Sequence, residues 1–170
     1  MTPGPALRDA PVAGPRRSDA RLDALSPRYK IVSFGEGRPR LYQETTRSIT
    51  VTVKPVYLEE QSRPGDNHFV WAYHVRIENK GHETVQLRRR HWRITDALGR
   101  LHEVRGPGVV GEQPVLRPGE TFEYTSGTPL ATPSGIMVGS YEMETGDGNS
   151  FSVAVPAFSL DSPHQAVRLN

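Results

Sequence analysis

The chain has 170 residues and a net charge of +2, and its low hydrophobic content of 35%, with 16 glycines and 15 prolines, is typical of short strands joined by turns. The absence of cysteine excludes disulfides, thiolate zinc sites and a thiol nucleophile. No apolar run approaches the roughly 18 residues of a membrane span, and the N-terminus lacks the apolar segment of a secretory signal, so a cytoplasmic location is expected.

The positive charge is concentrated in the N-terminal quarter of the chain. Eight lysines and arginines stand against four acids up to Leu41, which leaves 13 basic and 15 acidic residues from Tyr42 onward. Residues 1–41 are also rich in Pro, Ala and Gly, so they bury little apolar surface to offset the entropy of ordering. We expect a flexible basic arm over residues 1–41 and a folded domain over residues 42–170. Because the domain is mildly acidic, we do not expect it to bind nucleic acid.

From Tyr42 onward the hydrophobic pattern has a period of two, which indicates half-buried strands. The clearest strand is Phe69 to Glu78, whose alternate residues from Trp71 to Ile77 share one face. The expected strands cover residues 49–58 with a bend at Pro55, 69–78, 85–95, 101–105, 122–124, 136–143 and 151–155. Seven or eight strands at this spacing, without a helical period, predict an antiparallel β-sandwich.

Several local features of the domain are also predicted. Asp96 to Gly99 is expected to form a four-residue hairpin loop, and Asp147-Gly148 a type I′ turn. In a regular strand, Arg88 and Arg90 would share one face and Arg89 the other. Tyr141 is expected to bond back to a preceding turn as a tyrosine corner. The residues after Pro156 are expected to lie along the domain or to fray.

A glycine-rich stretch, Gly106 to Gly111, matches the G-x-G-x-x-G pattern that binds dinucleotide pyrophosphates at a helix N-terminus. Here the prolines at 114 and 118 are incompatible with a following helix. The glycines are explained by positive backbone dihedrals and close approach of strands. An alternative is an anion nest formed by successive amides. The residues of this candidate site are Gly106, Gly108, Gly111, Arg105 and Arg90.

Other chemistry has weaker support in the sequence. The six histidines are scattered, and no pair has the helical spacing of a metal site. Ser126, Ser134 and Ser140 lie beside glycines, but none is in a nucleophile-elbow motif. No acid–base pair has a persuasive spacing. We therefore expect no catalytic residues, no metal ligands and no bound cofactor, and we expect the protein not to be an enzyme.

The chain from about Tyr42 to Asn170 resembles the ApaG family. The resemblance rests on the strings Trp71-Ala72-Tyr73, Ile77-Glu78-Asn79, Arg90-His91-Trp92, Ile94-Thr95-Asp96, Val104 to Gly111, Tyr124 to Gly127 and Gly135 to Tyr141. The chain departs from the family pattern in its long basic arm and in Thr128, where a cysteine is often found.

The resemblance implies an immunoglobulin-like or fibronectin type III-like sandwich and an association with magnesium and cobalt efflux in bacteria. It also implies a proposed pyrophosphate-like role for Gly106, Gly108 and Gly111, whereas no catalytic residue is transferred. The leading hypothesis is a non-catalytic module that binds a protein partner and influences divalent-cation homeostasis. The alternatives are a nucleotide-polyphosphate or anion sensor at the glycine loop, and a metal-binding accessory protein using His91 or His102. The partner and the oligomeric state are not predicted.

Overall fold

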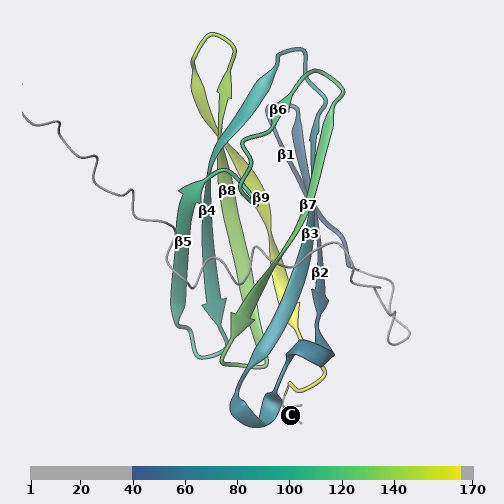
Figure 1. Ribbon diagram of the computed structural model, residues 1–170, viewed down its shortest axis with the longest axis vertical. Coiled ribbons are helices and arrows are strands. Elements are labelled where there is room, and N and C mark those ends of the chain that lie inside the picture. The colour runs from purple at the N-terminus through teal and green to yellow at the C-terminus, as the bar shows by residue number, and fades with distance from the viewer. Residues whose placement is uncertain (1–39, 166–170) are drawn as a thin grey trace, which may run out of the picture.

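The computed structural model describes residues 40–165, so the arm expected over residues 1–41 lies almost wholly outside the described residues. Within this range two antiparallel sheets face each other (Figure 1). One sheet has the order β1-β2-β3-β7 and the other β5-β4-β8-β9, with β6 beside β4. The strands are β1 (Tyr42–Thr46), β2 (Ile49–Tyr57), β3 (Phe69–Asn79), β4 (Val85–Asp96), β5 (Leu101–Pro107), β6 (Val115–Leu116), β7 (Thr121–Leu130), β8 (Ser134–Thr145) and β9 (Ser150–Asp161). The predicted sandwich is confirmed.

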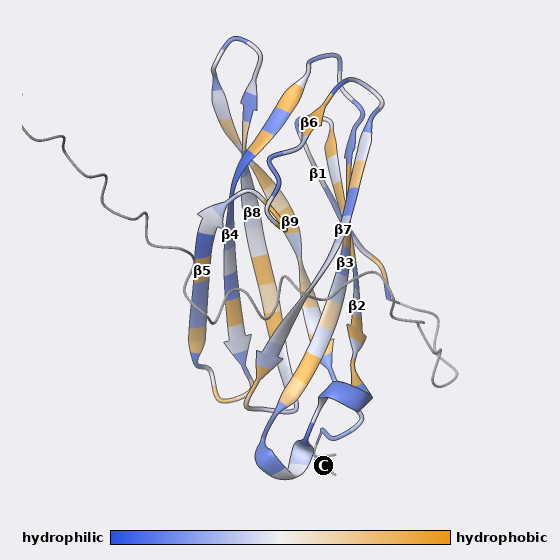
Figure 2. Cartoon of the chain, viewed as in Figure 1, coloured by the Kyte–Doolittle hydropathy of each residue, from blue (hydrophilic) through white to orange (hydrophobic). Residues whose placement is uncertain are grey.

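The core lies between the two sheets because apolar side chains alternate along every long strand, as the banding in Figure 2 shows. In β3 the predicted face is buried, from Trp71 through Ile77. Trp92 of β4 links the sheets, since its ring lies 5.4 Å from that of Tyr73 and 6.2 Å from that of Phe158, centroid to centroid. The buried indole N–H of Trp71 donates to the carbonyl oxygen of Asp161 at 2.9 Å, which satisfies its polar atom.

Pro55 and Pro156 lie inside strands instead of ending them. β2 continues through Pro55 to Tyr57, in a part of the strand that β1 no longer pairs. β9 continues through Pro156 to Asp161, at the point where its register with β8 shifts. A proline lacks an amide N–H, so it fits where no ladder hydrogen bond is required. The residues after Pro156 are therefore strand as far as Asp161, rather than a segment lying along the domain.

The hairpin between β8 and β9 differs from the predicted type I′ turn. Its loop contains four residues, 146–149, and Gly148 has a φ of 84° while Asp147 has no positive φ. The β4–β5 hairpin has the same geometry, with Gly99 at a φ of 78°. In this hairpin Asp96 accepts hydrogen bonds from the amides of Leu98 and Arg100, both at 2.9 Å. Burial raises the pKa of Asp96, but the hydrogen bonds from Arg100 and Leu98 outweigh it and hold the pKa below its usual value.

A β-bulge changes the faces of the arginine run in β4. Leu87 pairs with Met143 and Arg89 pairs with Glu142, so Arg88 is an extra residue in the ladder. Arg88 then reaches Glu144 at 3.4 Å, on the outer face of the sheet. Arg89 also lies on this face, and Arg90 pairs with the buried Tyr141 on the inner face. The prediction that Arg88 and Arg90 share a face was wrong, because it assumed a regular strand.

Gly139 of β8 provides a test of the sandwich packing. A Cβ at this position would lie 2.6 Å from the carbonyl oxygen of His91 and 2.6 Å from the Trp92 ring. We expect Gly139→Ala to lower the free energy of unfolding by about 3 kcal/mol, as overpacking against backbone does. Gly146→Ala is the matched control, because a Cβ there meets no atom within 4 Å, and its effect should stay within about 0.5 kcal/mol. Urea denaturation measures both, and equal effects would contradict the packing.

Candidate functional site

The glycine loop follows β5 and forms a tight turn. The amide of Val109 donates to the carbonyl oxygen of Glu112 at 2.8 Å, and the amide of Glu112 donates back at 2.9 Å. Between them Val110 and Gly111 both have positive φ, 45° and 78°. This is the pattern of a two-residue type I′ turn. The turn type predicted for Asp147-Gly148 therefore occurs at Val110-Gly111, with valine at a position that usually carries Asn, Asp or Gly.

The backbone itself requires two of the three glycines in the motif. Gly108 has a φ of 61°, its amide donates to the carbonyl oxygen of Arg88 at 2.8 Å, and a Cβ there would lie 2.2 Å from the carbonyl oxygen of Glu112. At Gly111 the turn requires a positive φ, which favours glycine, although a Cβ there would meet no atom within 4 Å. The amides of residues 108, 109 and 112 are thus hydrogen-bonded within the fold, which reduces the donors that a cradle for an anion would have.

Arg90 holds this loop from the inner side of β4. Its Nη1 donates to the carbonyl oxygen of Pro107 at 2.9 Å and to that of Gly108 at 3.0 Å. Gly106 lies directly opposite Arg90 in the ladder, and a Cβ on Gly106 would lie 3.2 Å from the same Nη1. Gly106 therefore leaves room for the guanidinium that fastens the loop. We call Arg90, Gly106, Pro107 and Gly108 the arginine clasp.

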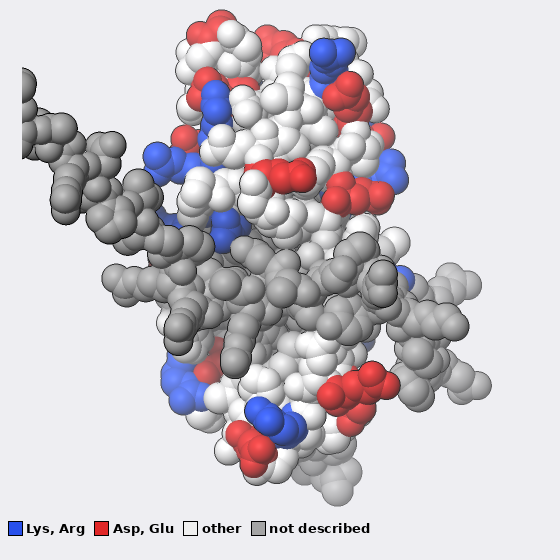
Figure 3. All heavy atoms as spheres, viewed as in Figure 1, with Lys and Arg blue, Asp and Glu red and all other residues white. Residues whose placement is uncertain are grey.

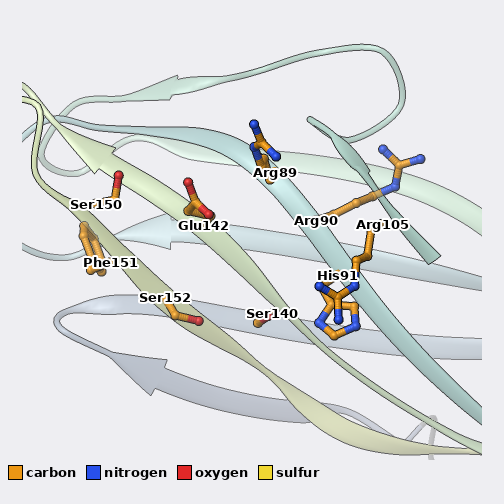
Figure 4. Close-up of a pocket in the computed structure, with 9 residues that line it drawn as sticks. All are labelled: Arg89, Arg90, His91, Arg105, Ser140, Glu142, Ser150, Phe151 and Ser152. Atoms are coloured by element: carbon orange, nitrogen blue, oxygen red, sulfur yellow. The ribbon is translucent and has the colours of Figure 1, made fainter. Parts of the chain in front are cut away.

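Arg105 lies on the opposite face of the sheet, because it pairs with His91 and not with Arg90. Its Nη2 lies 3.2 Å from Oε2 of Glu103, and Nε2 of His91 lies 3.2 Å from the same oxygen. Figure 4 shows Arg105 beside His91, while Arg90 extends away from both. The hydrogen bonds from His91 and Arg105 lower the pKa of Glu103. The structure thus brings Arg90 to the glycines, and places Arg105 in a separate cluster.

Two shallow hollows lie along β4 on its arginine-rich part, each of about 460 Å³. The first lies over β4, β8 and β9, and Figure 4 shows its lining. The second borders the glycine loop and is lined by Arg88, Arg89, Arg90, Gly106, Pro107, Gln113, Glu142 and Glu144. Arg89 lines both hollows and is exposed. Cationic and hydroxyl side chains can bind an anion here, although Glu142 and Glu144 oppose it.

A buried tyrosine pair was not predicted from the sequence. The hydroxyl groups of Tyr124 in β7 and Tyr141 in β8 form a short hydrogen bond across the two sheets. Burial raises the pKa of both phenols, so both remain neutral at physiological pH. The expected tyrosine corner was wrong, since the recorded partner of the Tyr141 hydroxyl is another side chain. Only the fold could reveal the pair, because it joins different sheets.

The histidines remain dispersed in the structure. Three of them pair with separate glutamates: His74 with Glu123, His91 with Glu103, and His164 with Glu59. Within residues 40–165, no three or more histidine and acidic side chains are grouped so as to hold a metal ion.

No helix among the described residues is long and apolar enough to cross a membrane.

Comparisons with known proteins identify the family of the chain. A profile of the ApaG domain matches residues 59–145. The chain is 74% identical over 130 residues to Protein ApaG of Paramagnetospirillum magneticum and 72% identical over 130 residues to Protein ApaG of Rhodospirillum centenum. Each match covers 76% of this chain and 100% of the relative. The crystal structure of the putative ApaA protein from Bordetella pertussis is similar, with a TM-score of 0.66 and 48% identity over 75% of this chain and 100% of that one.

The arginine clasp predicts unequal costs for substitutions in the glycine loop. Gly108→Ala and Gly111→Ala each place a side chain at positive φ, at about 1–2 kcal/mol. Gly108→Ala also drives a Cβ into the Glu112 carbonyl, so we expect it to cost at least about 1 kcal/mol more than Gly111→Ala. Urea unfolding followed by tryptophan fluorescence measures the difference. Equal costs would show that the loop relaxes freely and that the clasp does not hold it.

Proposed function

The chain belongs to the ApaG domain family, and we propose that it is a non-catalytic β-sandwich module that binds a protein partner in the bacterial cytoplasm. Through that partner it contributes to magnesium and cobalt homeostasis, the role that the family resemblance implies. The observation that carries the proposal is an exposed apolar row at one end of the five-stranded sheet. Such a surface has a cost in water that a partner would remove.

The apolar row is defined by the register of three strands. Leu101 of β5 and Ile136 of β8 lie on either side of Thr95 of β4, on the outer face. Both apolar side chains are 55% exposed, and Leu98 in the adjoining hairpin is 72% exposed. Cross-strand neighbours on one face are close enough to form a continuous surface. We call Leu98, Leu101, Thr95 and Ile136 the apolar row.

Charges around the sandwich favour a protein over a nucleic acid as the partner. On the face shown in Figure 3, basic and acidic side chains of the described residues are interspersed. Among the described residues, ion pairs such as Arg88 with Glu144 and Arg76 with Glu123 also join charges of opposite sign. A phosphate backbone requires a stripe of one sign. Mixed charge around an apolar centre is the usual composition of a protein interface.

Ile136→Asp tests this proposal without altering the core. We expect the variant to lose the partner that the full-length chain retains in an affinity pull-down, and to fail to restore cobalt and magnesium tolerance to a deletion strain. The reason is that a carboxylate at the centre of an apolar contact must be desolvated without a counter-charge. Pull-down with mass spectrometry and growth in graded cobalt measure the two effects.

Val115→Asp is the matched control, because Val115 is 51% exposed and lies on β6, away from the apolar row. It should behave as the wild type does in both assays. The proposal is wrong if Ile136→Asp and Val115→Asp retain the same partners and give the same cation tolerance, or if deletion of the gene leaves tolerance unchanged.

A second candidate function is a sensor of nucleotide polyphosphates or other anions at the glycine loop. The hollow that borders Gly106, with Arg88, Arg89 and Arg90 in its wall, is the observation that supports it. Arg105 lies on the same outer face as Arg89 and lines the neighbouring hollow. Since Arg90 is engaged with the loop carbonyls, Arg89 is the cation with most freedom to meet a ligand.

Calorimetry with diadenosine tetraphosphate tests the sensor. We expect saturable binding that Arg89→Ala weakens about tenfold, the loss of one charge-assisted contact. Arg93→Ala is the control, because Arg93 is exposed on the same strand but lines neither hollow. Absence of heat with the wild-type chain, or equal weakening by both variants, would remove this candidate.

A further inference from the structure

The open edge of the five-stranded sheet is formed by β5. Within residues 40–165 this strand pairs with β4 alone. Six of its seven residues are exposed, and Gly106 is half-buried. At the other end of the same sheet β9 packs against β1 and β2 of the opposite sheet, so that edge is covered. Figure 1 shows β5 at the margin of the sandwich. A strand edge of this length offers backbone groups for pairing with another chain.

The hydrogen-bond pattern identifies which backbone groups β5 offers. Asp96 N–H donates to the carbonyl of Arg100, and Gly108 N–H donates to the carbonyl of Arg88, so residues 100 and 108 are bonded to β4. Along an antiparallel strand, every second residue directs its N–H and C=O groups to the same neighbouring strand. The backbone groups of residues 102, 104 and 106 are therefore also bonded to β4. The N–H and C=O groups of Leu101, Glu103 and Arg105 are therefore directed to the open side.

We propose that β5 is a self-pairing edge, at which two copies of this chain form a symmetric dimer with one continuous sheet. The two-fold axis passes beside Val104. In this register Glu103 lies opposite Arg105 of the second copy, and Arg105 lies opposite Glu103 of the second copy. Each pair exchanges both backbone hydrogen bonds and places opposite charges on the same face. The surface is thus complementary to itself, as a two-fold interface requires.

The side chains of β5 select this register over its neighbours. An axis at Glu103 would set the two Glu103 carboxylates opposite each other, and an axis at Arg105 would do the same with two guanidinium groups, which is unfavourable. At Val104 the contact is between two valines, each 37% exposed in the single chain. Pro107 of each copy lies opposite Leu101 of the other copy. Because proline has no N–H, the hydrogen-bonded ladder between the two copies ends there.

The ion pair between Glu103 and Arg105 within one chain can be replaced by ion pairs between two copies. Glu103 and Arg105 side chains are 41% and 71% exposed, and they now meet each other on one strand at 3.2 Å. Exposed ion pairs within one strand contribute little to stability, so exchanging them for pairs across the axis costs little. His91 is the other group within reach of Glu103, at 3.2 Å on β4. It stays beside the carboxylate in the dimer because β4 does not move.

Analytical ultracentrifugation of the full chain over a range of concentrations tests the proposal. The wild type is expected to sediment as a monomer–dimer equilibrium. Glu103→Arg leaves two cations on the edge and Arg105→Glu leaves two anions, so each variant alone should dimerise about tenfold more weakly or worse. An equimolar mixture of the two variants should recover dimerisation, since every charge then faces its opposite.

Recovery in the mixture requires both variants to be folded and to associate through the charged edge of β5, which makes the test specific to this edge. Glu44→Arg makes the same charge change on β1, at the edge of the other sheet, and should leave the dimer unaffected. The proposal is overturned if the wild type is monomeric at all concentrations up to its solubility limit. It is also overturned if the single variants dimerise as the wild type does, or if their mixture remains monomeric.

Discussion

The packing of the Trp92 ring between the two sheets is the interaction on which the rest of the sandwich depends. Its ring contacts Tyr73 from one sheet and Tyr141 and Phe158 from its own, with centroid separations of 5.4, 6.1 and 6.2 Å. Such edge-on aromatic contacts add to the free energy of burial. Gly139 lies beneath the indole because no side chain fits there. This contact fixes β4 against β8, and β4 in turn carries the arginine run, the clasp and the partner strand of β5.

A dinucleotide-like motif here has a structural basis. In a Rossmann unit the glycines allow a pyrophosphate to approach a helix N-terminus. In this sandwich Gly106 makes room for Arg90, Gly108 avoids the Glu112 carbonyl, and Gly111 completes a type I′ turn. Backbone conformation and packing thus explain these three glycines without a bound ligand. An anion bound here would meet chiefly the arginines of the neighbouring hollow, rather than a free nest of amides.

The outer face of the five-stranded sheet combines the two surfaces proposed for interaction. The apolar row lies across β5, β4 and β8 at the hairpin end, and the self-pairing edge follows β5 itself. Leu101 belongs to both, and in the proposed register it lies opposite Pro107 of the second copy. The apolar rows of the two copies therefore lie at opposite ends of the shared edge. Ile136 lies on β8, two strands from the edge, and its substitution separates partner binding from dimer formation.

The sequence by itself determined seven of the nine strands of residues 40–165, the sandwich and the family, because alternating hydrophobicity and turn residues are local properties of the chain. The predicted ranges contained neither β1 nor β6. The sequence also located the glycine loop, but not its turn type or the role of Arg90. The role of Arg90 depended on the β-bulge at Arg88, which shifts the strand faces by one residue and which no local pattern predicted. The Tyr124–Tyr141 pair and the open edge at β5 were likewise decided by tertiary structure. Both depend on which strands become neighbours, and that is set by packing between distant segments.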